Sequence, residues 1–227
     1  TKGFGTEQIE MELEDLFPTA KIGRMDLDTT RGKYGYQKIL GKFQAKEIDV
    51  LVGTQMVAKG LDFDNVSLVG ILNADAMLNF PDFRAFERSY QLMSQVSGRA
   101  GRKSKRGKVL IQTYNPYHAI IRQVISHDYD GMYKDEIAQR KKFKYPPFQR
   151  LIYFKLKHKD KNMLNAGAEE FAYALKTKFG NRVLGPDFPV ISRIKNLYHK
   201  NIMLKVEREK SIQKTRELVM KVKNTFA

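Results

Sequence analysis

Two short apolar runs do most to limit the folds open to this chain. They are "DVLVGT" at 49–54 and "VSLVGILNA" at 66–74, and both are rich in apolar and β-branched residues. Such runs are typical of parallel strands that are buried on both faces. Shorter strand candidates and segments with helical spacing surround them, at 6–17, 20–26, 34–47, 81–96 and 108–114. This alternation of strands and helices predicts an α/β domain with an open parallel sheet and flanking helices.

The breaker "YPPF" at 145–148 divides the chain, because proline ends helices and restricts the residue before it. We therefore expect a first domain at 1–145 and a second at 146–227. The second domain has a predicted order of elements: a strand at 151–157, a helix at 160–179, a connection at 180–189, strands at 190–195 and 199–207, and a helix at 210–225. This βαββα order predicts a small α+β sandwich with both helices on one face of the sheet.

The charge of the chain is strongly basic and unevenly distributed. Lys and Arg number 41 and Asp and Glu number 25, which gives a net charge of +16. The residues up to Tyr145 include 23 basic and 18 acidic side chains, whereas those from Pro146 on include 18 and 7, a net charge of +11. Such an excess favours a polyanionic partner, although a purely solubilising surface has the same composition.

The sequence has no cysteine and four scattered histidines, at positions 118, 127, 158 and 199. Disulfides and thiolate metal sites are therefore excluded, and the histidines lack ligand spacing, so we expect no metal site. No apolar run reaches about 18 residues, and the first residues lack the pattern of a signal peptide. These features predict a soluble, cytoplasmic protein with no membrane partner.

Two arginines three positions apart stand out in "QVSGRAGR" at 95–102. Gly98 is suited to cap the end of a helix, so Arg99 and Arg102 are expected on or near a tight turn. Each guanidinium can bind a phosphate through two hydrogen bonds, and an arginine supplied to a γ-phosphate speeds turnover by roughly 10³ to 10⁵. Spacing alone favours the plainer alternative of a solvated basic turn.

A second candidate, "GTQMVAKGLDF" at 53–63, directly follows the first apolar run. Ligands of open α/β sheets bind beyond such carboxyl ends of strands. The glycines of this segment allow close backbone approach, and its polar side chains offer hydrogen bonds and charge. The sequence has no G-x-x-x-x-G-K-[ST] phosphate loop, because no Gly-Lys pair is followed by Ser or Thr. We expect the isolated chain not to hydrolyse ATP.

Four segments together resemble one family: "GTQMVAKGLDF", "LNADAMLNFPDFRAFERSYQLMSQVSGRAGR", "YPPF" and "GPDFPVISRIKNLY". They are similar to the second motor lobe and C-terminal domain of the PriA family of primosomal replication-restart DNA helicases, in superfamily 2. The resemblance covers essentially the whole chain, with the fifth helicase motif at 53–63 and the sixth at 95–102. The family's cysteine-rich zinc insertion is absent, so the chain is expected to start just after it.

This resemblance implies a RecA-like first domain, taken from a two-lobe ATPase that moves 3′ to 5′ on single-stranded DNA in replication restart and primosome assembly. By position, Arg99 and Arg102 would reach the γ-phosphate of ATP, which with Mg²⁺ is held mainly by the lobe that carries the Walker motifs. Gly60 and Asp62 would approach the nucleotide. Three further side chains would lie nearer the DNA backbone: Thr54, Gln55 and Lys59. The implied partners are forked and single-stranded DNA, single-stranded-DNA-binding protein and primosome proteins.

The second domain has basic and aromatic residues around its expected hairpin turn. Basic groups can track phosphates and tyrosine can stack on unpaired bases, so four residues are candidate DNA contacts: Arg193, Lys195, Tyr198 and Lys200. Phe154 and Phe171 are instead expected in the core. Two other classes of protein stay open, a non-catalytic nucleic-acid or partner-binding module and an RNA helicase lobe. The second of these does not explain the second domain.

Overall fold

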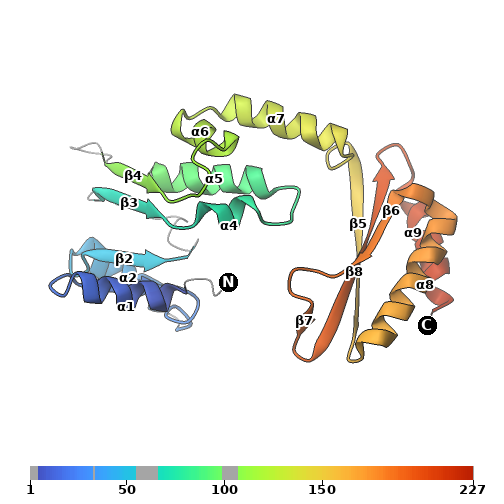
Figure 1. The fold of residues 1–227 in the computed structure, drawn as a ribbon, viewed down its shortest axis with the longest axis horizontal. Coiled ribbons are helices and arrows are strands. Elements are labelled where there is room, and N and C mark those ends of the chain that lie inside the picture. Colours follow the sequence, from blue (N-terminus) through green and yellow to red (C-terminus); the bar gives the residue numbers. More distant parts are fainter. Residues whose placement is uncertain (1–4, 33, 55–65, 99–106, 227) are drawn as a thin grey trace. The chain divides into compact units, whose positions relative to one another are not determined.

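The computed structural model describes residues 5–32, 34–54, 66–98 and 107–226. The chain forms two compact units, unit 1 with Thr1–Phe80 and Ala85–Tyr129 and unit 2 with Pro81–Arg84 and Asp130–Ala227 (Figure 1). It therefore passes between the units three times. Helix α7 (Tyr129–Lys142) falls almost wholly in unit 2, so the units divide before the expected domain boundary at 145–146. The division into two domains at 145–146 stays a prediction.

Unit 1 consists of short parallel strands and the helices around them. Its described elements are α1 (Thr6–Leu16), β1 (Ile22–Met25), α2 (Gly35–Gln44), β2 (Val50–Gly53), β3 (Leu68–Ile71), α4 (Ala74–Leu78), α5 (Ala85–Ser97), β4 (Lys108–Ile111) and α6 (Ala119–Ile125). β1 pairs with β2 and β3 pairs with β4, both in parallel. The expected parallel pairing is confirmed. In place of one continuous sheet, however, the described residues form two separate pairs, since β2 and β3 are not paired with each other.

Apolar side chains at helical spacing attach the helices of unit 1 to its strands. Met25 of β1 is fully buried. The side chains packed against it are Tyr36, Ile39, Leu40 and Phe43 of α2, Leu51 of β2, and Val66. On α5, Tyr90 and Met93 are buried. The α5 helix also packs against α6, whose buried residues are Ile120, Ile121 and Val124.

Unit 2 is an antiparallel sheet with two long helices. After α7 its elements are β5 (Gln149–His158), α8 (Lys161–Phe179), the short 3₁₀ helix η1 (Gly180–Arg182), β6 (Val183–Asp187), β7 (Arg193–Ile194), β8 (Leu197–Glu207) and α9 (Ile212–Asn224). The sheet order is β5-β8-β6, and β7 pairs with the start of β8. The predicted order βαββα was wrong in one respect, because β6 lies in the segment expected to be a connection. Val183 and Leu184 pair there with Leu204 and Met203 of β8.

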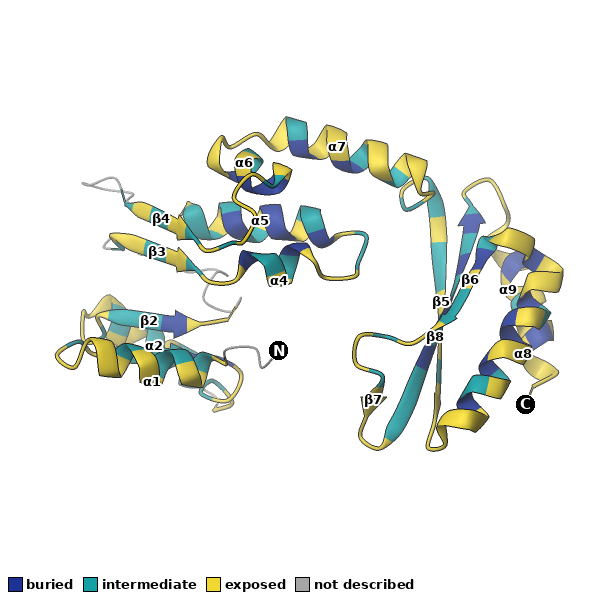
Figure 2. Cartoon of the chain, in the orientation of Figure 1, coloured by how far each residue is buried: buried dark blue, intermediate teal, exposed yellow. Residues whose placement is uncertain are grey.

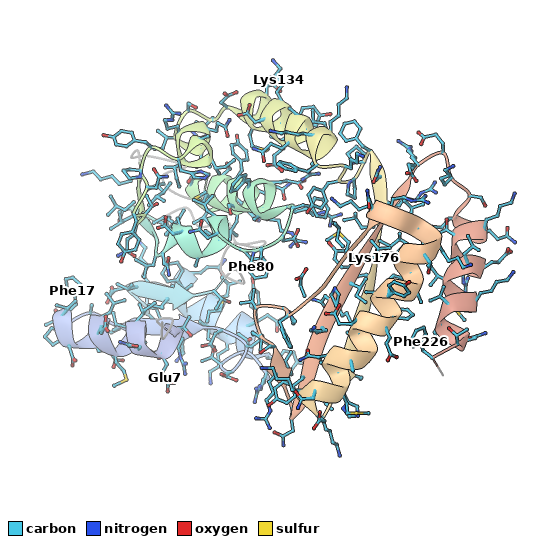
Figure 3. All side chains as sticks on the ribbon, turned by 45° about the vertical axis from the view of Figure 1, so that its right-hand side comes forward. Glu7, Phe17, Phe80, Lys134, Lys176 and Phe226 are labelled. Carbon is cyan, nitrogen blue, oxygen red and sulfur yellow. The ribbon has the colours of Figure 1, made fainter. Side chains whose placement is uncertain are left out.

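The core of unit 2 lies on one face of this sheet. Figure 2 shows the buried residues of α8 on the side toward the strands, with α9 on the same side of the sheet. The buried cluster contains Phe171, Ala172, Leu175, Phe179, Val183, Ile202, Leu204, Val206 and Val222, and Phe154 packs against it. Both helices therefore cover one face as predicted, and the core positions expected for Phe154 and Phe171 are confirmed. Phe226, labelled in Figure 3, follows α9 and meets Phe171 edge-on, with ring centroids 5.5 Å apart.

Within the described ranges, no helix is both long enough and apolar enough to cross a membrane.

Candidate nucleic-acid interface

The carboxyl ends of β1 and β2 lie at one edge of their sheet. Met25 is opposite Gly53 in the parallel register, so the residues that follow these strands, Asp26 and Thr54, leave the sheet at the same edge. Thr54 is exposed. Of the residues predicted to approach DNA or nucleotide from the fifth motif, Thr54 alone falls within the described ranges.

Asp26 organises the turn at this edge. Its Oδ2 accepts hydrogen bonds from the Thr6 hydroxyl at 2.6 Å and from Arg24 Nη1 at 3.2 Å. Its Oδ1 accepts from the backbone N–H groups of Asp28 at 3.0 Å and Thr29 at 2.9 Å. The Thr6 hydroxyl and the Thr29 N–H, with the positive charge of Arg24, lower the pKa of Asp26 to about 2. The carboxylate thus joins α1 to the end of β1 and fixes the loop beside Thr54.

The remaining predicted site residues of unit 1 lie outside the described residues. They are Gln55, Lys59, Gly60, Asp62, Arg99 and Arg102, and their roles stay predictions. The structure describes the elements that lead to them. β2 ends at Gly53, and α5 ends at Ser97, where the Gly98 N–H donates to Ser94 O at 3.0 Å. The helix therefore ends directly before Gly98, as the sequence predicted.

Asp75, the acidic residue nearest a strand end of the second sheet, has a structural role. Its Oδ1 accepts from the Thr113 hydroxyl at 3.0 Å, and its Oδ2 accepts from the Tyr114 N–H at 2.9 Å. These bonds hold the start of α4 to the segment that follows β4. Among the described residues, no group of three or more His, Asp or Glu is placed to hold a metal ion.

In unit 2, the hairpin between β7 and β8 presents predicted contacts at its tip. Arg193 pairs with Tyr198 and Ile194 with Leu197, which leaves Lys195 and Asn196 as a two-residue turn. Both turn residues have positive φ, 48° and 61°, as the central residues of a type I′ hairpin turn do. Lys195 and Arg193 are exposed. The turn therefore places the exposed residue Lys195 at the tip of the hairpin.

Arg193 and Tyr198 form a preorganised pair beside this turn. The Arg193 guanidinium carbon lies 5.1 Å from the centre of the Tyr198 ring, and Arg193 Nη2 donates to Asn196 Oδ1 at 3.3 Å. A guanidinium over a tyrosine is favourable by cation–π attraction. The pair holds a positive group and an aromatic ring side by side, which are the two groups that single-stranded nucleic acids engage.

Lys200 is placed differently from the other three predicted contacts. It is only 6% exposed, its Nζ lies 3.5 Å from Glu169 Oε1, and it lies 5.0 Å from the centre of the Phe188 ring. It lies on the same face of β8 as the core residues Ile202 and Leu204. Lys200 is therefore better placed to hold Glu169 and Phe188 than to reach a phosphate.

Sequence reasoning overlooked the lysines at the end of β5. In the antiparallel register Lys155 lies opposite Asn201, and Lys157 lies opposite His199. Both lysines are exposed, as is Lys159 just beyond the strand. The signal was present, because the alternation in "FKLKHK" puts lysine at every second position. Together with the β7–β8 hairpin these lysines form a basic end of the sheet, defined by Lys155, Lys157, Lys159, Arg193 and Lys195.

Comparison with known proteins gives matches along both units. Residues 5–104 match the family described as "Helicase conserved C-terminal domain", and residues 141–225 match the family described as "Primosomal protein N C-terminal domain". The chain is 44% identical over 209 residues to the replication restart protein PriA of Bacillus subtilis (strain 168), across 91% of this chain and 26% of that protein.

Other relatives with the same description give similar values. For Treponema pallidum (strain Nichols) the identity is 43% over 206 residues, across 89% of this chain and 31% of the relative. For Borreliella burgdorferi it is 36% over 224 residues, across 96% and 34%. The chain thus spans about a quarter to a third of the length of these relatives.

Proposed function

Because the chain belongs to the PriA family of replication restart proteins, we propose that it is the second motor lobe and C-terminal domain of an ATP-dependent 3′ to 5′ DNA helicase. The helicase acts in replication restart and primosome assembly at stalled forks. The observation that carries the proposal is the tandem order of the two family matches, at 5–104 and 141–225. The parallel strand pairs of unit 1 and the helices around them support a RecA-like motor lobe.

In this proposal the chain contributes half of an ATPase site. Arg99 and Arg102 stabilise the charge that develops on the transferred phosphoryl group, and Gly60 and Asp62 approach the nucleotide. ATP and Mg²⁺ are held mainly by the lobe with the Walker motifs. The chain by itself is proposed not to hydrolyse ATP, because its sequence has no phosphate-cradling loop.

The ATPase role is tested by reconstitution. The chain is mixed with the remaining, Walker-containing part of the protein, and DNA-stimulated ATP hydrolysis is measured for the wild type, Arg102→Ala and the neighbouring control Arg106→Ala. We expect Arg102→Ala to lower turnover by roughly 10³ or more and the control to leave it nearly unchanged. Wild-type turnover by Arg102→Ala would exclude the arginine role and favour a non-catalytic binding module.

We further propose that both units contact DNA. Thr54, Gln55 and Lys59 lie along the backbone of the strand on which the motor moves. In unit 2 the contacts come from the basic end of the sheet and from Tyr198, with Lys200 supporting it from within. The exposure of Arg193 and Lys195, and the cation–π pair of Arg193 with Tyr198, support this assignment.

The DNA role predicts a specific salt dependence. If about five phosphates are neutralised, the logarithm of the binding constant for a fluorescent single strand should fall with log salt at a slope of roughly −3.5. Fluorescence anisotropy of this chain measures it. Lys195→Ala should make the slope shallower by about 0.7, whereas Lys176→Ala, on the exposed side of α8 (Figure 3), should not. A flat slope would mean that the charge only solubilises, and tighter binding of duplex RNA than of forked DNA would favour an RNA helicase.

Single-stranded-DNA-binding protein and primosome proteins are the further partners that family membership supports, and a cytoplasmic location belongs to the same proposal. Co-sedimentation of this chain with single-stranded-DNA-binding protein tests the first of these partners. Loss of binding when the acidic tail of that partner is removed is the expected result.

A further inference from the structure

The sheet of unit 2 has one face that its two long helices leave open. Both α8 and α9 lie on the other side of the sheet (Figure 2), where Ile152, Phe154 and Leu156 of β5 pack against the buried cluster. Side chains alternate between the two faces along a strand, so the residues between these three point the opposite way. We call this side the open face, and it is defined by Tyr153, Lys155, Lys157, Leu184, His199, Asn201 and Met203.

An apolar row crosses the open face. Met203 of β8 lies opposite Tyr153 of β5 on one side and Leu184 of β6 on the other. Tyr153 is 50% exposed and Leu184 is 42% exposed, so the row still has apolar area to bury against a partner. Burial, aided by Tyr145 and Asp82, raises the pKa of Tyr153. Its hydroxyl is therefore uncharged at neutral pH and does not repel an anion.

Lysines continue the line of Tyr153 along the open face. Lys155 and Lys157 follow it at every second position of β5, and both are exposed. Successive side chains on one face of a strand are about 7 Å apart. The ring of Tyr153 and the two ammonium groups therefore form one line that leads to the basic end of the sheet.

The opposite end of the open face is covered from within unit 2. Lys205 Nζ lies 3.9 Å from the centre of the Tyr145 ring and donates to Phe143 O at 2.7 Å. Tyr145 in turn stacks on Phe83, with centroids 4.9 Å apart and an interplanar angle of 6°. Both rings belong to unit 2. The accessible part of the open face therefore begins at Tyr153 and extends toward the basic end.

Acidic residues lie only at the borders of this surface among the described strands of unit 2. Glu207, at the last position of β8, accepts from Arg182 Nη1 at 3.0 Å. Asp187 is exposed at the last position of β6. The basic end contributes five exposed cations, so the accessible part of the open face is positively charged and suits a polyanion.

We propose that the open face binds an unpaired nucleic-acid strand, with one base stacked on the Tyr153 ring and the adjoining phosphates at Lys155 and Lys157. An unpaired strand presents apolar base faces and charged phosphates together, which matches an apolar row followed by a line of lysines. A duplex hides its base faces and offers mainly its phosphates. The inference rests on the proposed DNA contact of unit 2, and it adds the face of the sheet and the residue that stacks.

Fluorescence anisotropy with this chain tests the stacking. The probe is a labelled thymidine oligonucleotide, used as a single strand and annealed to its complement. We expect Tyr153→Ala to weaken binding of the single strand by about tenfold and binding of the duplex by less than about twofold. The salt dependence should keep its slope, because no charge is removed.

Two further variants sharpen this test. Tyr153→Phe keeps the ring and should bind the single strand within about twofold of the wild type. Tyr173→Ala is the matched control, since Tyr173 is 73% exposed on α8, the helix that covers the other face. It should bind both probes like the wild type.

Wild-type binding of the single strand by Tyr153→Ala would overturn the proposal, and so would equal losses for the single strand and the duplex. If Tyr153→Ala does not fold, Tyr153→Leu removes the ring but keeps an apolar side chain, and the same comparison applies. A salt-dependent wild type with no effect at Tyr153 refutes the stacking alone and leaves the DNA role of unit 2 standing. A wild-type chain that does not bind the single strand refutes both.

Discussion

The two units fix their strands by different means. In unit 2 the helices α8 and α9 bury a continuous apolar cluster on one face of the sheet, including the fully buried Ile202 and Leu204. In the first sheet of unit 1 the cluster centres on one buried side chain, Met25. Beside it, the strand end is held by hydrogen bonds to the Asp26 carboxylate. Unit 2 therefore depends mainly on apolar packing, whereas this part of unit 1 depends on a charged group that acid can remove.

The largest effect is expected from a cavity in the core of unit 2. Leu204→Ala removes a side chain that is fully buried, so we expect the free energy of unfolding of unit 2 to fall by about 3 kcal/mol. Urea unfolding followed by the methyl NMR signals of Ile202 measures it. Leu184→Ala, on a neighbouring strand but 42% exposed, is the control and should cost less than about 1 kcal/mol. Equal losses would mean that packing on this face does not dominate.

A smaller effect is expected from acid on unit 1. The folded pKa of Asp26 is about 2, below the ordinary value of 3.8. The stabilisation is thus complete above about pH 4 and is lost as the pH falls towards 2. We expect the free energy of unfolding of unit 1 to fall by about 1 to 2 kcal/mol over this range. Urea unfolding monitored through the methyl NMR signal of Met25 measures this change.

The Asp26→Asn variant serves as the reference for this acid effect. It should be less stable than the wild type at pH 6 and should show a flatter pH dependence in unit 1. The signals of Ile202 in unit 2 should change little with this substitution. If Asp26→Asn kept the wild-type pH profile of Met25, another carboxyl group would account for the acid sensitivity.

The smallest effect concerns the hairpin turn, where stability and binding are predicted to change in opposite directions. Lys195 has φ 48°, which asparagine adopts more readily than lysine. Lys195→Asn should stabilise unit 2 by about 0.5 kcal/mol and weaken binding to single-stranded DNA. Lys195→Gln removes the same charge without this conformational preference, so it should weaken binding without stabilising. Thermal unfolding and fluorescence anisotropy measure the two effects, and unchanged binding by both variants would remove Lys195 from the proposed interface.

Long patterned elements were predictable from the sequence, and short or nonlocal ones were not. The strands β5 and β8 were expected within two residues of their observed ends, because ten or more residues of alternation carry a clear period. β6 was missed because Gly185 and Pro186 signal a turn. In the structure Gly185 has φ 93°, and a Cβ there would lie 2.8 Å from Asn201 O. This glycine allows a bulged strand to approach β8 closely.

In the candidate site, too, local features were predictable from the sequence and nonlocal contacts were not. The hairpin around Lys195 was expected from the two strands that flank it. The burial of Lys200 follows from its place in the alternation of β8, which was not weighed against its charge, and its contact with DNA stays a prediction. The stack of Phe83 on Tyr145 has no local signal, since 62 positions separate the two residues. Contacts of that kind depend on how the whole chain folds, which periodicity does not report.

The division of unit 2 between Pro81–Arg84 and the residues from Asp130 on also limits how genes can be recombined. A crossover point anywhere between codons 85 and 129 takes Phe83 from one parent and Tyr145 from the other. In a chimaera of two related proteins joined there, the two segments of unit 2 come from different parents and have not evolved together. A single crossover upstream of codon 81 keeps unit 2 intact, because the tetrapeptide and the C-terminal region then come from the same parent.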